Sequence, residues 1–136
     1  MDEALVRSLI DALRASPGNV ALRMTVIRAL HGAGDARAVD HVDGLSADGL
    51  AVSDRAVVGR VLVAAGQAQR ALGFVEGVEP EVLIVRARAL HALRDQAGAL
   101  AAYEAAVRVN PTFEDRSIST HERIRSNDRQ FSLGRR

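Results

Sequence analysis

The stretch PEVLIVRARALHALRDQAGALAAYEAAVRVNP, residues 80–111, decides the fold because it reads as two helices joined by a tight turn. Its apolar residues recur at helical spacing, and no alternating strand pattern interrupts them. Pro80 suits the first position of a helix that we expect to end near Leu93. A second helix is expected over residues 96–109, where Asn110 and Pro111 would end it. The stretch therefore predicts a helical hairpin.

When the chain is aligned with itself, this hairpin occurs three times. The three copies share one leucine position, which we call the anchor: Leu30, Leu62 and Leu90. An arginine stands two residues before each anchor, and the tetrapeptide Arg-Ala-Leu-His occurs in both the first and the third copy. Gly34 and Gly66 lie four residues after the first two anchors, where the third copy has Arg94. The sequence is therefore expected to contain three repeated helix-turn-helix units.

The rest of the chain also has helical periodicity, so the expected fold class is all-α. Further helices are expected over residues 2–16, 20–33, 36–45, 53–65 and 67–76. After residue 111 alanine disappears, and a capping helix is expected over 112–126 before a flexible polar tail. The expected organisation is a helical-repeat domain over residues 1–111, followed by the capping helix and tail over 112–136. Within the domain we expect an N-terminal helix (1–18) and three repeats (19–50, 51–79 and 80–111).

The third copy resembles the tetratricopeptide repeat, whose pattern is Trp-x2-Leu-Gly-x2-Tyr, then Ala-x3-Phe and a closing Pro. Arg86 and Ala87 stand where that family has Leu-Gly, which departs from the pattern. Leu83 stands at the Trp position and Leu90 at the Tyr position. The residues that match the second half of the pattern are Ala99, Tyr103, Ala106 and Pro111. The first two copies are more degenerate, and the resemblance covers about residues 19–111. It implies a right-handed α-solenoid of about three repeats with an extra N-terminal helix, and the alternative is another helical array or bundle.

The arginines two residues before the anchors point away from them, because a helix turns by 100° per residue. In tetratricopeptide proteins this face of the first helix lines a concave groove that binds peptides, so the resemblance implies a partner-binding role for it. The residues expected on this face are Arg28, Arg60, Arg88, Met24, His31, Ser53, Ala56, Val63, Ile84 and His91. An extended acidic segment could meet successive arginines through bidentate carboxylate contacts. Alternatively, the arginines only solvate an exposed face.

Composition and motifs bear on the other functional classes. The chain has 136 residues, a net charge of +1, no cysteine, and only arginine as its basic residue. This balance gives no strong reason to expect a nucleic-acid partner. His31 and His91 are one repeat apart, so they cannot share an ion, and no catalytic constellation stands out. We therefore expect no metal, no cofactor and no enzymatic activity.

The expected function is a protein-interaction module that binds an extended or helical partner segment. A second copy of the chain is an alternative partner. An alternative is an N-terminal adaptor of, or partner for, a bacterial ATPase of the AAA class. A small enzyme or a nucleic-acid binder is the third alternative. The N-terminus lacks the charge pattern of a signal peptide, and no apolar run reaches the roughly 20 residues of a membrane span. We therefore expect a cytoplasmic protein with no membrane partner.

Overall fold

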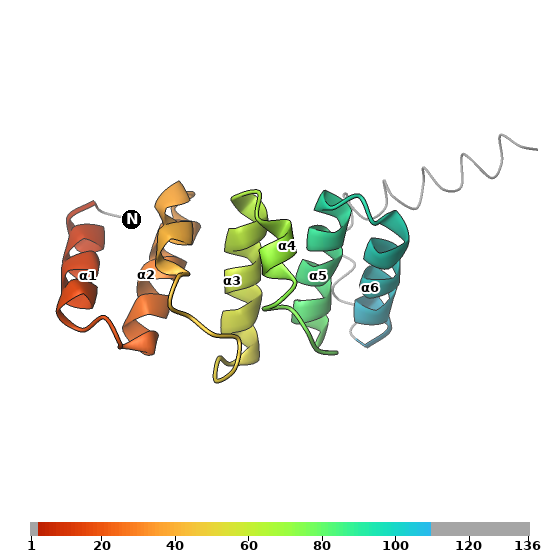
Figure 1. Ribbon diagram of the computed structural model, residues 1–136, viewed down its shortest axis with the longest axis horizontal. Helices are drawn as coiled ribbons and strands as arrows, with labels where there is room; N and C mark the ends of the chain where they lie inside the picture. The colour runs from red at the N-terminus through yellow and green to blue at the C-terminus, as the bar shows by residue number, and fades with distance from the viewer. Residues whose placement is uncertain (1–2, 110–136) are drawn as a thin grey trace, which may run out of the picture.

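The computed structural model describes residues 3–109, and over this range the chain is helical with no strand. The helices are α1 (Glu3–Ala15), α2 (Val20–Gly32), η1 (Ala36–His41), α3 (Val52–Ala64), α4 (Ala68–Ala71), α5 (Pro80–Ala92) and α6 (Gln96–Val109). Figure 1 shows these elements following one another in chain order along the longest axis of the molecule. The all-α prediction is confirmed over this range, whereas the expected capping helix and tail lie outside the described residues.

Helices α1, α2, α3, α5 and α6 form within one residue of the expected bounds, over their described residues. Pro80 occupies the first turn of α5, where its missing N–H costs no helical hydrogen bond. Asn19 lies at the N-cap of α2, and its side chain accepts a hydrogen bond from the backbone N–H of Leu22. None of the described helices has the length and apolar character needed to cross a membrane.

The second helices of the first two copies are shorter than expected. A helix was expected over residues 36–45, but the chain forms only the 3-10 helix η1, which has six residues. The helix expected over 67–76 is reduced to α4, which has four residues. Gly44 interrupts the first of these segments with a φ of 90°, and Gly73 interrupts the second, and glycine disfavours the continuation of a helix. The alanine-rich α6 keeps its full expected length.

The buried side chains form three connected clusters. The N-terminal cluster joins α1 to α4, and the anchors Leu30 and Leu62 are fully buried in it. A middle cluster joins α3 to α5 through Ala56, Val75, Val82 and Val85. The C-terminal cluster joins α5 to α6, and the third anchor, Leu90, packs against it while only partly buried. The anchor leucine is therefore fully buried in two copies and partly buried in the third.

The first helix of each copy ends in the same hydrogen-bond pattern. In every copy the anchor carbonyl accepts a hydrogen bond from the backbone N–H five residues later, at 2.8–2.9 Å. The residue before that donor has a left-handed backbone: φ is 70° at Gly34, 78° at Gly66 and 66° at Arg94. This arrangement is a Schellman motif, which satisfies carbonyls that a helix end would otherwise leave unpaired. The repeat register seen in the sequence therefore corresponds to a repeated backbone geometry.

Candidate functional site

The ten residues predicted to bind a partner lie on or next to α2, α3 and α5. Three of them contribute little surface, since Met24, Ala56 and Ile84 are 4%, 0% and 3% exposed and pack within the three clusters. The other seven have partly or fully exposed side chains: Arg28, His31, Ser53, Arg60, Val63, Arg88 and His91. We call the surface that carries Arg28, Arg60 and Arg88 the arginine face. The role of these residues in binding stays a prediction, and only these seven offer accessible area for it.

Arg28 is not a free cation on this face, because it forms an ion pair with Asp54. Asp54 lies in the first turn of α3, where the helix dipole also favours a negative charge. The pair links α2 to α3 across 26 residues of sequence. Both side chains keep contact with solvent, so the pair contributes modestly to stability. Its main effect is to neutralise the α2 end of the arginine face.

Arg60 and Arg88 lie on the adjacent helices α3 and α5 and act on each other electrostatically. Burial lowers the pKa of the half-buried Arg88, and the positive charge of Arg60 lowers it further. Arg88 is already engaged within the structure. In contrast, Arg60 forms no hydrogen bond or ion pair with any residue between 3 and 109. Of the three arginines of this face, Arg60 on α3 is therefore the one whose charge no residue between 3 and 109 compensates.

Two arginines that the sequence analysis did not single out have a structural role. Arg23 and Arg55 both stand seven residues before an anchor, and each donates to the backbone at or beyond the end of a shortened second helix. Arg23 Nη1 lies 3.3 Å from the carbonyl oxygen of His41, and Arg55 Nη1 lies 2.6 Å from that of Glu76. The third copy, whose second helix is complete, has Leu83 at this position. The recurrence of arginine at this position in the first two copies was the available signal.

Arg86 has a similar role in the same region. Its Nε and Nη2 atoms donate to the carbonyl oxygen of Val75, at 2.9 and 2.5 Å. The segment between α4 and α5 is therefore held by Arg55 from α3 and by Arg86 from α5. Arg86 stands where the tetratricopeptide pattern has leucine, so this departure has a physical reason in the loop that it binds.

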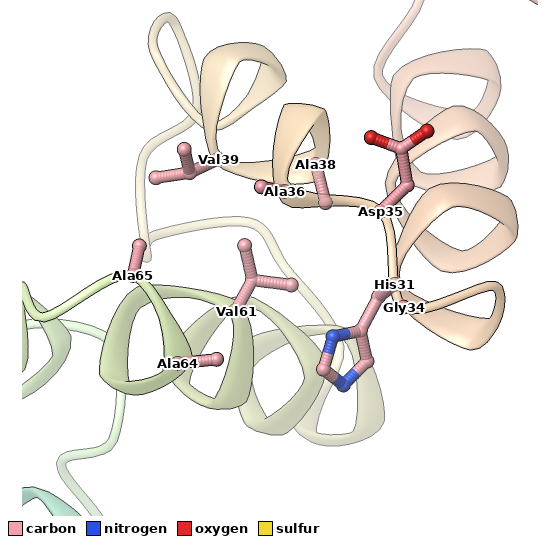
Figure 2. Close-up of a pocket in the computed structure, with 9 residues that line it drawn as sticks. All are labelled: His31, Gly34, Asp35, Ala36, Ala38, Val39, Val61, Ala64 and Ala65. Atoms are coloured by element: carbon pink, nitrogen blue, oxygen red, sulfur yellow. The ribbon is translucent and has the colours of Figure 1, made fainter.

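A pocket of about 250 Å³ lies between the C-terminal end of α2, η1 and the C-terminal half of α3. It is lined by His31, Gly34, Asp35, Ala36, Ala38, Val39, Val61, Ala64 and Ala65. Figure 2 shows the η1 residues on one side of the pocket and the α3 residues on the opposite side. Ala38 and Val61 are buried at its base, whereas His31 and Asp35 supply its polar groups. The lining is otherwise apolar.

Neighbouring residues shift the pKa of Asp35, which lines the pocket, and of His41, at the end of η1. Hydrogen bonds from the side chain and backbone of Arg37 lower the pKa of Asp35 to about 2, so this carboxylate stays charged near neutral pH. Burial lowers the pKa of His41, at the end of η1, and the nearby charge of Arg23 adds to this effect. Among residues 3–109, no group of three His, Asp or Glu side chains could hold a metal ion.

Comparisons with protein-family models, with curated proteins and with solved structures give no significant match to this chain. The tetratricopeptide resemblance of the third copy therefore stays a prediction from the sequence. The functional argument rests on the positions and charges of the side chains described above.

Proposed function

We propose that the chain is a tetratricopeptide-like, right-handed α-solenoid that binds an extended acidic segment of a protein partner along the arginine face. The three repeated Schellman motifs and the serial order of the helices support this fold (Figure 1). The positive charge on the first helices of the copies supports the choice of partner.

The observation that carries the proposal is the charge of Arg60, which forms no hydrogen bond or ion pair with any residue between 3 and 109. Arg88 lies on the adjacent helix α5, where burial lowers its pKa and the positive charge of Arg60 lowers it further. A carboxylate bound beside them would offset the repulsion and could accept two hydrogen bonds from the planar guanidinium of Arg60. We therefore centre the proposed binding on Arg60 rather than spread it evenly over three arginines, because Arg28 is paired with Asp54 and Arg88 is engaged within the structure.

The proposal is tested by fluorescence anisotropy with labelled peptides that contain two glutamates three residues apart in a Gly, Ser and Gln background. This spacing matches helices that lie roughly 10 Å apart, since an extended chain rises about 3.3 Å per residue. We expect the Glu peptides to bind more tightly than their Gln counterparts, and the difference to shrink as salt is added. The Arg60→Glu/Arg88→Glu variant is expected to bind the Glu peptides at least about tenfold more weakly, or about 1.4 kcal/mol.

The matched control is Arg7→Glu/Arg108→Glu, which changes the net charge by the same amount at two exposed positions on α1 and α6. This variant is expected to retain the Glu preference. If the Arg60/Arg88 variant and the control bind the Glu peptides equally well, the arginine face is not the binding surface.

A further inference from the structure

We propose that the pocket between α2, η1 and α3 is an anchor site for one neutral aliphatic side chain of the same partner segment. This inference rests on the proposed function, because it uses the arginine face to fix the position of that segment. It adds a second recognition element to the acidic residue, so the predicted ligand is a segment with an aliphatic residue close to an acidic one.

The pocket has the size and lining of a site for a single side chain. Its volume of about 250 Å³ lies below the roughly 300–1,000 Å³ that small-molecule sites usually have. The cause of the pocket is the shortness of η1, which leaves Ala64, the last residue of α3, and the following Ala65 exposed without a full second helix above them. A leucine-sized side chain would cover this apolar surface and remove it from water.

The pocket is continuous with the arginine face. Ala64 lines the pocket and lies one helical turn after Arg60, so their Cβ atoms are about 5–6 Å apart. His31 lines the pocket from α2 and belongs to the predicted partner-binding set. An extended segment rises about 3.3 Å per residue, so an aliphatic side chain in the pocket and an acidic one at Arg60 would be roughly two residues apart.

The charges near the pocket distinguish the two positions of the partner. Asp35 lines the pocket, but its carboxylate points away from the α3 residues (Figure 2) and is paired with Arg37. Over the described part of the chain, the pocket lining contains no arginine that could pair with an acidic side chain, whereas Arg60 just outside the pocket attracts one. The pocket is therefore suited to the neutral residue, and the acidic residue belongs next to Arg60.

The test uses the Glu peptides described above with one added leucine, placed two residues before the first glutamate in one series and two residues after the second in the other. Each has a partner peptide with alanine in place of leucine. In one of the two series we expect the wild-type chain to bind the Leu peptide at least about tenfold more tightly than the Ala peptide. Addition of that Leu peptide should also shift the NMR methyl signals of Val39 and Val61 more than the Ala peptide does.

Ala64→Leu fills the pocket from an exposed position and leaves Arg60 in place. We expect it to bring the affinities for the Leu and Ala peptides close together while the preference for Glu over Gln remains. Ala101→Leu, at an exposed position of α6, is the control and should retain both preferences. Circular dichroism of both variants checks that their helices are intact.

The outcomes separate the two proposals. If the wild-type chain prefers Glu to Gln peptides but binds Leu and Ala peptides alike in both series, the anchor site is overturned and the arginine face stands. A Leu preference that survives Ala64→Leu also overturns the anchor site. If no peptide shows a preference for Glu that depends on Arg60 and Arg88, the proposed function itself fails.

Discussion

Arg94 has the backbone conformation that glycine has in the other two copies, with a φ of 66°. A residue with a Cβ atom is strained there, so Arg94→Gly is expected to raise the free energy of unfolding by about 0.5–1 kcal/mol. Gly66→Ala, at the equivalent position of the second copy, should lower it by a similar amount. Urea denaturation followed by circular dichroism measures both. A lower stability of Arg94→Gly would show that the arginine side chain contributes more than its backbone strain costs.

Gly59 is the point of closest approach between α3 and its neighbours. A Cβ atom there would lie 2.6 Å from Cγ1 of Val75 and 2.8 Å from Cγ1 of Val85. Both valines are buried and stiff, so Gly59→Ala is expected to lower the free energy of unfolding by about 1–3 kcal/mol. The control is Gly32→Ala, whose Cβ would have no atom within 4 Å and should be neutral or stabilising. Thermal denaturation that ranks the two variants in the opposite order would contradict this packing.

The ion pair of Asp35 and Arg37 predicts a pH dependence of stability in acid. Arg37 lowers the pKa of Asp35 to about 2 in the folded chain, below the value of about 3.9 expected when unfolded. The unfolded state therefore binds the proton first, and the stabilisation is complete above about pH 5 and lost between about pH 4 and 2. Asp35→Asn keeps the N-cap oxygen but removes this titration, so its stability should fall less over that window.

The pKa of Asp35 can be followed directly by carbon-13 NMR of its carboxyl group. Arg37→Gln removes the main cause of the shift and should move the pKa of Asp35 upward toward its ordinary value. If the midpoint stays at about 2 in Arg37→Gln, the hydrogen bonds from Arg37 are not its cause.

Arg55 holds the segment that follows the short helix α4. Its side chain is 17% exposed and donates to the carbonyl oxygen of Glu76 as well as pairing with Glu79. Arg55→Met retains much of the packing but leaves that carbonyl without its donor, so stability should fall by about 1–3 kcal/mol. Amide hydrogen exchange in residues 72–79 should also accelerate.

The matched control for Arg55→Met is Arg28→Met, which removes a solvent-exposed ion pair and should cost less. Equal losses for the two variants would mean that the Arg55 hydrogen bond adds nothing beyond an ordinary surface pair.

The sequence predicted the long helices well because their signals are local. Pro80 marks the start of α5, and the alanine-rich pattern extends unbroken through α6. The segments 36–45 and 67–76 have comparable periodicity but are interrupted or followed by glycine, and periodicity alone does not show how many turns such a segment can retain. Their loops are held by Arg23 and Arg55 from other helices, which are contacts between residues distant in sequence.

The sequence predicted which side of each helix carries the candidate site, but it did not predict which of those side chains are exposed. Ala56 lies on the same side of α3 as Arg60, one turn earlier, yet it is completely buried against the middle cluster. A helical wheel gives the direction of a side chain but not the position of the neighbouring helix. For the same reason the sequence did not reveal that Asp54 pairs with Arg28, or that a short η1 would leave a pocket beside Ala64.

At the scale of the whole molecule, α1 is the end of the helical series and packs chiefly against α2. It has only two buried residues, Val6 and Leu13, whereas α3 and α5 each have helices on both sides. We therefore expect α1 to open locally at a lower free energy than α3 or α5. Hydrogen exchange followed by mass spectrometry should show faster exchange in residues 3–15. Equal protection of α1 and α3 would instead indicate that the whole molecule opens as one cooperative unit.

The position of Tyr103 makes it an internal optical reporter. It is the only tyrosine in a chain without tryptophan, and it is 1% exposed in the cluster between α5 and α6. Its intrinsic fluorescence therefore reports the environment of the C-terminal helical pair alone, whereas far-ultraviolet circular dichroism averages over every helix. Coincident melting curves from the two signals would indicate one transition for the entire chain, and separated curves would show that its two ends unfold independently, without any label being introduced.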